Sequence, residues 1–262
     1  MGTNLTFHDS HLVTRETREE IHGQKGFTIW LTGLSASGKS TIAVELEHEL
    51  LTKRGVAAYR LDGDNIRMGL NKGLGFTAED RTENIRRIGH VAKLFADSNM
   101  IAIASFISPY AEDRQAVRDV HALSPEGKET DKQLRFIEVY VKVNVETAAE
   151  RDPKGLYAKA LAGEIQHFTG VSPDAPYFAP KNPEILLEND NLKIKDAVKQ
   201  IMDYLDEQKL LPTPAQALEA AAKKITSIAQ NIPAAPAPAA PEATEVPATT
   251  EIPVVSEAPA AN

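Results

Sequence analysis

The sequence predicts an α/β fold in which a parallel sheet of about five strands is covered by helices on both faces, giving three layers. Apolar, strand-like runs alternate with helical runs between residues 27 and 206, and the first run leads directly into a glycine-spaced turn. Composition agrees, because 42% of the 262 residues are hydrophobic, which is enough for a substantial core.

The expected elements follow one another in alternating order. Apolar runs predict strands at 27–32, 56–64, 100–106, 135–143 and 184–188. Helical patterns occur at 39–53, at 78–98, from about 112, and at 193–208. The helix at 78–98 carries a stripe that should face the core, formed by Ile85, Ile88, Ala92 and Phe95. The stretch between the fourth and fifth strands is polar and contains glycines, and no regular element is predicted there.

The glycine-spaced turn matches a phosphate-binding loop at every fixed position. Gly33 is followed by four residues and then by Gly38, Lys39 and Ser40, the pattern G-x-x-x-x-G-K-[ST]. The glycines let backbone N–H groups surround phosphate oxygens, Lys39 supplies a positive charge, and Ser40 can ligate Mg²⁺. A buried strand before the loop and an amphipathic helix after it are the required context. The sequence therefore predicts nucleotide binding in a P-loop nucleoside triphosphate hydrolase (kinase) fold.

Polar side chains follow the second and third predicted strands. Ligands of parallel sheets bind at the carboxyl ends of the strands, so Asp62, Asp64 and Arg67 are expected beside the phosphate loop. A carboxylate there can orient Mg²⁺ or accept a hydroxyl proton, and the competing interpretation is that either aspartate caps a turn or the next helix. Ser108 follows the third strand, where it can donate a hydrogen bond or take the phosphoryl group itself. No base adjoins it in sequence, so positioning is the more economical role.

The helix at 78–98 offers a polar face near its N-terminal end. Arg81 and Asn84 are three residues apart and share that face, which suits an anionic acceptor. Arg86 and Arg87 fit a solvated charged face instead.

Cations and aromatic residues also occur in loop-like surroundings. Arg151, Lys154 and Lys159 lie in a glycine-punctuated segment typical of a lid that closes over transferring phosphates and excludes water. Phe76 and Phe168 either stack on the two faces of a base or anchor the core.

Charge and residue usage exclude several classes of function. The net charge of −8 argues against broad nucleic-acid binding, so an anionic substrate must be met by local arginines and lysines. Cysteine is absent, which excludes disulfides, a thiol nucleophile and cysteine-ligated metal, and fits a cytoplasmic protein. With no long apolar run and no secretory leader, we expect neither a membrane span nor export. Met1, Gly2 and Thr6 fit a short N-myristoylation pattern that recurs by chance.

The chain is expected to divide into four parts: an N-terminal segment at 1–26, the P-loop domain at 27–212, an amphipathic helix at 213–232, and a disordered tail at 233–262. The apolar stripe from Leu218 to Ile232 either docks on the domain or a partner, or belongs to a helix that frays in solvent. The tail is rich in proline and alanine and lacks lysine and arginine, so it cannot bury enough apolar area to offset its ordering entropy.

Taken together, the segments resemble the adenylylsulfate kinases (APS kinases), the fungal members above all. The matching segments, spread from about residue 4 to 211, are "GQKGFTIWLTGLSASGKST", "YRLDGDNIRMGLNKGLGF", "EDRTENIRRIGHVAKLFADS", "SFISPY", "RDPKGLYAKA" and "EIQHFTG". The resemblance implies that Mg-ATP phosphorylates the 3′-hydroxyl of adenosine 5′-phosphosulfate (APS), giving 3′-phosphoadenosine 5′-phosphosulfate (PAPS) and ADP. It also implies a homodimer in cytoplasmic sulfate assimilation.

The same resemblance assigns roles to individual residues. ATP would bind the loop formed by Gly33, Leu34, Ser35, Ala36, Ser37, Gly38, Lys39, Ser40 and Thr41. Asp64, supported by Asp62, would handle the acceptor hydroxyl and, with Ser40, Mg²⁺. APS would contact Arg67, Arg81, Asn84, Ile107 and Ser108, with its adenine between Phe76 and Phe168. Arg151 would flank the ATP base, and Lys154 and Lys159 would be the lid cations. The expected catalytic residues are Lys39, Asp62, Asp64 and Ser108. Descriptions of the family often make the serine a phosphoserine intermediate, whereas direct in-line transfer fits phosphoryl chemistry as well.

The chain departs from the family pattern at Ala111, Leu161 and Phe178, where a basic residue, an arginine and a glutamate are usual, and "GVSPDAPYF" is about two residues longer than the common form. Two other functions compete with the APS kinase interpretation. One is a non-catalytic, PAPS-binding regulatory domain like the kinase-like domain of fungal ATP sulfurylase, and the other is a P-loop kinase of another small metabolite. A regulatory domain could lose its ATP loop, whereas this chain keeps Gly38, Lys39 and Ser40.

Overall fold

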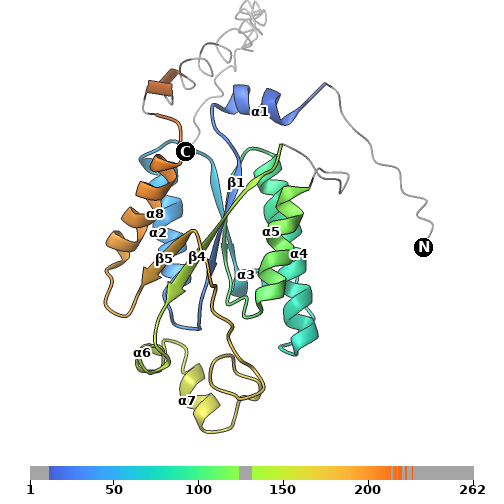
Figure 1. Ribbon diagram of the computed structural model, residues 1–262, viewed down its shortest axis with the longest axis vertical. Coiled ribbons are helices and arrows are strands. Elements are labelled where there is room, and N and C mark those ends of the chain that lie inside the picture. Colours follow the sequence, from blue (N-terminus) through green and yellow to red (C-terminus); the bar gives the residue numbers. More distant parts are fainter. Residues whose placement is uncertain are drawn as a thin grey trace, which may run out of the picture.

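A five-stranded parallel sheet forms the centre of the molecule (Figure 1). The computed structural model describes residues 12–123 and 132–213, together with isolated positions between 215 and 226. The strands are β1 (Phe27–Thr32), β2 (Ala58–Asp62), β3 (Ile101–Ser105), β4 (Arg135–Lys142) and β5 (Ile185–Glu188). They are ordered β2-β3-β1-β4-β5, and Phe27 of the central strand lies opposite Ile101 on one side and Arg135 on the other. The predicted parallel sheet is confirmed.

Helices cover both faces of the sheet, as predicted (Figure 1). On one face lie α2 (Lys39–Thr52) and α8 (Ile194–Glu207), and on the other lie α4 (Ala78–Asp97) and α5 (Ala111–Ala122). The short helices α3 (Gly63–Met68), α6 (Val145–Arg151) and α7 (Leu156–Leu161) follow the carboxyl ends of β2 and β4. The sequence pattern predicted none of these three, because each is too short to show a helical period.

Each face of the sheet has its own hydrophobic core. Strand β1 is buried along its whole length, and its alternating side chains serve both cores. Ile29 and Leu31 belong to the core shared with α2 and α8, whereas Trp30 belongs to the core under α4 and α5. Burying a side chain of this size stabilises the fold by about 1.5–3 kcal/mol. The stripe predicted on α4 is confirmed, with Phe95 partly buried at its end.

The second strand was predicted to run to residue 64, which is wrong. β2 ends at Asp62, because the Asp62 side chain accepts a hydrogen bond from the backbone N–H of Asp64 and caps α3. The predicted N-terminal segment also contains a helix, α1 (Arg15–His22). It buries no residue, and Arg15 joins it to Asp97 of α4 through two hydrogen bonds of 3.0 and 2.6 Å.

Several predictions fall outside the described part of the chain. The N-myristoylation pattern at Met1, Gly2 and Thr6 lies there, as do the tail at 233–262 and most of the stripe from Leu218 to Ile232. The domain boundary at 212 stays a prediction. Among the residues that the structure describes, no helix is both long and apolar enough to cross a membrane.

Candidate active site

A cleft of about 740 Å³ runs along the carboxyl edge of the sheet. This volume is typical of small-molecule sites, and the location is the one expected for a parallel sheet. The predicted site residues that line it are Ser35, Ala36, Gly38, Lys39, Ser40, Thr41, Asp62, Asp64, Arg67, Phe76, Arg81, Asn84, Ile107, Ser108, Arg151, Lys154 and Phe168. Four predicted residues do not line it: Gly33, Leu34 and Ser37, which belong to the phosphate loop, and Lys159, which is exposed on α7.

The phosphate loop requires its two glycines. Gly33 has φ +149°, and a Cβ there would lie 2.4 Å from the Val141 carbonyl oxygen. Gly38 has φ +97°, and its Cβ would lie 2.8 Å from Asn189 Nδ2. A side chain at either position would strain the backbone, so only glycine lets the loop close against the ends of the strands. Helix α2 then begins at Lys39, so its unpaired N–H groups and the positive end of its dipole are directed at the cleft.

Lys39 is folded back onto the loop that carries it. Its Nζ donates to the Leu34 carbonyl oxygen at 2.6 Å and to Ser37 Oγ at 3.2 Å. Burial lowers the pKa of Lys39 to about 7, although the carboxylates of Asp62 and Asp64 act in the opposite direction. An anion bound in the cleft would favour the charged form of Lys39 and raise its pKa again.

Asn189 contacts the phosphate loop and was not predicted from the sequence. It is 2% exposed, its Nδ2 donates to the Ser37 carbonyl oxygen at 2.5 Å, and its backbone N–H donates to Lys142 at the end of β4. Arg151 donates to the carbonyl oxygens of Asn189 and Asp190 at 2.7 and 2.6 Å. These contacts fix the wall of the cleft beside the phosphate loop. Its position directly after the fifth strand is the sequence feature that could have indicated it as a site residue.

Two carboxylates and a hydroxyl provide oxygen ligands next to the loop. Asp62 is 6% exposed, and its Oδ2 has no hydrogen-bond partner among the described residues, with Arg60 Nη1 at 3.8 Å. Ser40 Oγ lies 3.4 Å from Ser105 Oγ. Asp64 is well exposed and forms an ion pair with Lys154. Magnesium in kinases typically takes one or two protein oxygens and completes its shell with phosphate and water, so this donor set fits Mg²⁺. The capping interpretation of Asp62 is also confirmed, through its other oxygen.

Two guanidinium groups organise another part of the cleft wall. Arg67 donates to the carbonyl oxygens of Leu74 and Gly75, both at 3.0 Å, and lies 4.5 Å from the centroid of the Phe76 ring. Arg81 donates to the Phe76 carbonyl oxygen at 2.9 Å. Burial lowers the pKa of both arginines, which nevertheless keep their charge at neutral pH. The wall is therefore cationic and already held in place.

The amide and the aromatic residues of the prediction lie beside this wall. Asn84 is buried, and its Oδ1 accepts from Asn71 Nδ2 at 2.8 Å. Phe76 is 60% exposed, whereas Phe168 is 9% exposed and packs edge-on against Tyr157 at 5.0 Å between ring centroids. Tyr157 OH donates to the Ser35 carbonyl oxygen at 3.1 Å, so the predicted lid contacts the phosphate loop.

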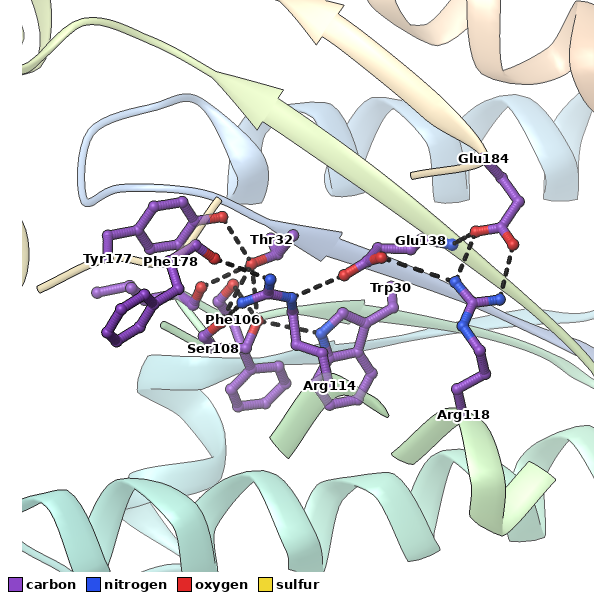
Figure 2. Close-up of polar contacts among 11 residues, drawn as sticks. Trp30, Thr32, Phe106, Ser108, Arg114, Arg118, Glu138, Tyr177, Phe178 and Glu184 are labelled. Carbon is purple, nitrogen blue, oxygen red and sulfur yellow. Dashed lines mark hydrogen bonds and ion pairs between the residues drawn. The ribbon is translucent and has the colours of Figure 1, made fainter. Parts of the chain in front are cut away.

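Ser108 lines the cleft, and its hydroxyl both accepts and donates a hydrogen bond (Figure 2). It is 2% exposed, accepts from Trp30 Nε1 at 3.1 Å and donates to Thr32 Oγ1 at 2.8 Å. Thr32 directs its own proton to the Ile107 carbonyl oxygen at 2.7 Å. Burial raises the pKa of Tyr177, whose hydroxyl therefore stays protonated and donates to Thr32 at 3.0 Å. This arrangement suits a positioning role, because among the described residues no base accepts the Ser108 proton.

The positions that depart from the family pattern differ in their surroundings. Ala111 is the first residue of α5. Leu161 at the end of α7 is 72% exposed. Phe178 is 50% exposed, and both of its backbone polar groups are hydrogen-bonded.

Comparisons with known proteins agree on one family. The family model described as adenylylsulphate kinase matches residues 25–188. An adenylyl-sulfate kinase of Penicillium chrysogenum is 63% identical over 212 residues, covering 81% of this chain and 98% of the relative. An adenylyl-sulfate kinase of Staphylococcus carnosus is 52% identical over 208 residues, covering 79% of this chain and 98% of the relative.

Solved structures give the same result. The APS kinase of Mycobacterium tuberculosis in complex with AMPPNP and APS superposes with a TM-score of 0.63 and 46% identity, covering 70% of this chain and 99% of the other. A hexameric APS kinase from Thiobacillus denitrificans superposes with a TM-score of 0.52 and 31% identity, covering 72% of this chain and 30% of the other.

Proposed function

The chain belongs to the adenylylsulphate kinase family and transfers a phosphoryl group from ATP to APS, and we propose that the cleft along the sheet edge performs this transfer with the residues named below. The product is PAPS, so the reaction serves sulfate assimilation. The observation that carries the proposal is that phosphate-loop residues, Lys39 and Ser40 among them, line the same cleft as Arg67 and Arg81. Turnover of APS with Mg-ATP by the purified chain tests it. A non-catalytic PAPS-binding domain has no need for Lys39 and Ser40 in this arrangement.

On the ATP side, the backbone N–H groups from Gly33 to Thr41 bind the phosphates, and Lys39 moves from the Leu34 carbonyl to the transferred group. Ser40 and Asp64 would hold Mg²⁺, which would neutralise charge on the phosphate oxygens. Asp64 also orients the acceptor hydroxyl and accepts its proton, and Asp62 supports it by capping α3. Arg151 flanks the base, and Lys154 leaves Asp64 to meet the phosphates when the lid closes.

On the acceptor side, Arg67 and Arg81 neutralise the phosphosulfate, and the amide of Asn84 completes this wall. Ile107 and Ser108 form the floor, and the adenine of APS stacks between Phe76 and Phe168. Lys159 is assigned to the closed lid. This arrangement would place the 3′-hydroxyl between the acceptor wall and the phosphate loop, as in-line transfer requires.

Direct transfer predicts that Ser108→Ala keeps measurable kinase activity. Its hydroxyl is held by Trp30 and Thr32, so it contributes position rather than a nucleophile. Brief incubation of the wild-type enzyme with γ-labelled ATP should leave no stoichiometric label on the protein. Acid-stable label at Ser108 that forms and discharges at the turnover rate would establish the phosphoserine route instead.

The depressed pKa of Lys39 predicts proton uptake on ATP binding. At pH 8 the free enzyme, with a Lys39 pKa of about 7, holds this amine mostly neutral, and bound phosphate raises the pKa so that the amine gains a proton. The ATP dissociation constant should therefore rise above about pH 7, by at most about tenfold per pH unit. Calorimetry at pH 8 in buffers of different ionisation enthalpy should give close to one proton per ATP, and none for Lys39→Met. Equal uptake by both proteins would contradict the assignment.

We further propose a homodimer located in the cytoplasm. The cysteine-free composition fits that compartment, and the Thiobacillus denitrificans relative is described as hexameric, which shows that a relative of this fold assembles. Sedimentation velocity of the purified chain measures the state of assembly.

A further inference from the structure

A buried arginine on α5, Arg114, links the Ser108 backbone to the Phe178 backbone (Figure 2). Arg114 is 3% exposed, and each of its three guanidinium nitrogens donates a hydrogen bond. Nε contacts Glu138 Oε1 at 2.7 Å, Nη1 contacts the Ser108 carbonyl oxygen at 2.8 Å, and Nη2 contacts the Phe178 carbonyl oxygen at 2.8 Å. One side chain thus joins strand β4, the loop that follows β3 and the segment that precedes β5.

The peptide that Arg114 holds has a conformation that needs support. Ser108 has φ +40°, in the left-handed region, which is strained for a non-glycine residue. Arg114 holds its carbonyl oxygen, while Thr32 donates to the carbonyl oxygen of the preceding residue at 2.7 Å. Phe178 N–H donates to the Pro109 carbonyl oxygen at 2.9 Å, so the segment at 177–178 is tied to the same turn twice.

The positive charge of Arg114 is balanced by Glu138 on β4, which does not line the cleft. Glu138 on β4 accepts from Arg114, and its other oxygen lies 3.6 Å from Arg118. Arg118 forms a two-pronged ion pair with Glu184 at 2.6 and 2.8 Å, and Glu184 also accepts from the Glu138 N–H at 2.8 Å. Burying such charges gives little net stability. Only the planar fork of an arginine reaches Glu138 and both carbonyl oxygens at once, so that geometry is the specific feature.

We propose that Arg114 is a positioning residue for the acceptor. By holding the Ser108 peptide and the segment at 177–178 against each other, it keeps the floor at Ile107 and Ser108 in the shape that receives APS before APS arrives. Because the link is made to the Phe178 backbone, it is independent of the side chain at this position, which departs from the family pattern. The inference rests on the proposed function of the cleft.

Kinetics test the proposal with a conservative variant. Arg114→Lys keeps the positive charge beside Glu138 but cannot reach both carbonyl oxygens. We expect the KM for APS to rise at least about tenfold, the scale of a lost charge-assisted hydrogen bond, while the KM for ATP changes less than about twofold. The double variant Arg114→Gln, Glu138→Gln, which removes both charges, should show the same split. Arg118→Gln removes a neighbouring ion pair on the same helix and should leave both KM values near wild type.

The single tryptophan gives a readout that needs no turnover. Trp30 is fully buried and donates to Ser108 Oγ, so its fluorescence reports the position of the floor. Arg114→Lys should shift the emission of the free protein, and Arg118→Gln should not. Wild-type emission or a wild-type KM for APS in folded Arg114→Lys overturns the proposal, as does an equal rise in both KM values. Absence of APS turnover by the wild-type enzyme would instead overturn the proposed function.

Discussion

Replacing Asp64 by asparagine lowers kcat at least about 100-fold while the protein stays folded. Asp64 lies in the first turn of α3 and lines the cleft, where we propose that it receives the acceptor proton and holds Mg²⁺. Asparagine keeps the shape but removes the charge and the basicity. The side chain is well exposed, so little packing is lost. Initial rates of ADP formation with APS measure the effect, and circular dichroism checks the fold.

Asp203→Asn is the matched control for this substitution. Asp203 is an exposed carboxylate that forms an ion pair with Lys199 on α8, outside the cleft, and thus resembles the pair of Asp64 with Lys154. Its loss should leave kcat unchanged. A folded Asp64→Asn enzyme with near-normal kcat would show that the carboxylate does not take part in transfer.

Replacing Lys39 by alanine lowers kcat/KM for ATP at least about 100-fold. The ammonium group is the cation of the phosphate loop, and charge on the transferred group is stabilised mainly by such positioned cations. Folding should survive, because burial already disfavours the charged amine in the free protein, as its depressed pKa shows. Thermal unfolding and the rate of ADP formation separate the two effects.

Lys199→Ala controls for the general loss of a lysine, because Lys199 is exposed on α8, outside the cleft. It should bind ATP and turn over like the wild-type enzyme. Normal kcat/KM in a folded Lys39→Ala enzyme would be incompatible with the proposed phosphate loop.

The phosphate loop and the residues at the strand ends could be predicted because each follows from a local pattern and one general rule. The loop is a contiguous motif, and parallel strands bring their carboxyl ends to one edge, which placed Asp62, Asp64 and Ser108 together. The same rule applies to the fifth strand, and it would have indicated Asn189 had it been used there.

Arg114 could not be predicted, because its partners are remote in the sequence. It lies in a charged helical stretch whose sequence is typical of a solvent-exposed face. Its contacts are instead with Glu138 on β4 and with Phe178, which follows the lid. No local period encodes such contacts. Helix α1 was missed for another reason: it buries no residue, so only its end signals, the Thr14 cap and the left-handed Gly23, mark it.

Turnover with a panel of acceptors tests the central claim most directly. The purified 262-residue chain is incubated with Mg-ATP and one acceptor at a time: APS, adenosine 5′-monophosphate or gluconate. ADP and the phosphorylated product are then quantified. We expect rapid ADP formation with APS and none with the other two acceptors, and an amount of PAPS equal to the ADP formed. Turnover of the monophosphate or of gluconate, with none of APS, would contradict it.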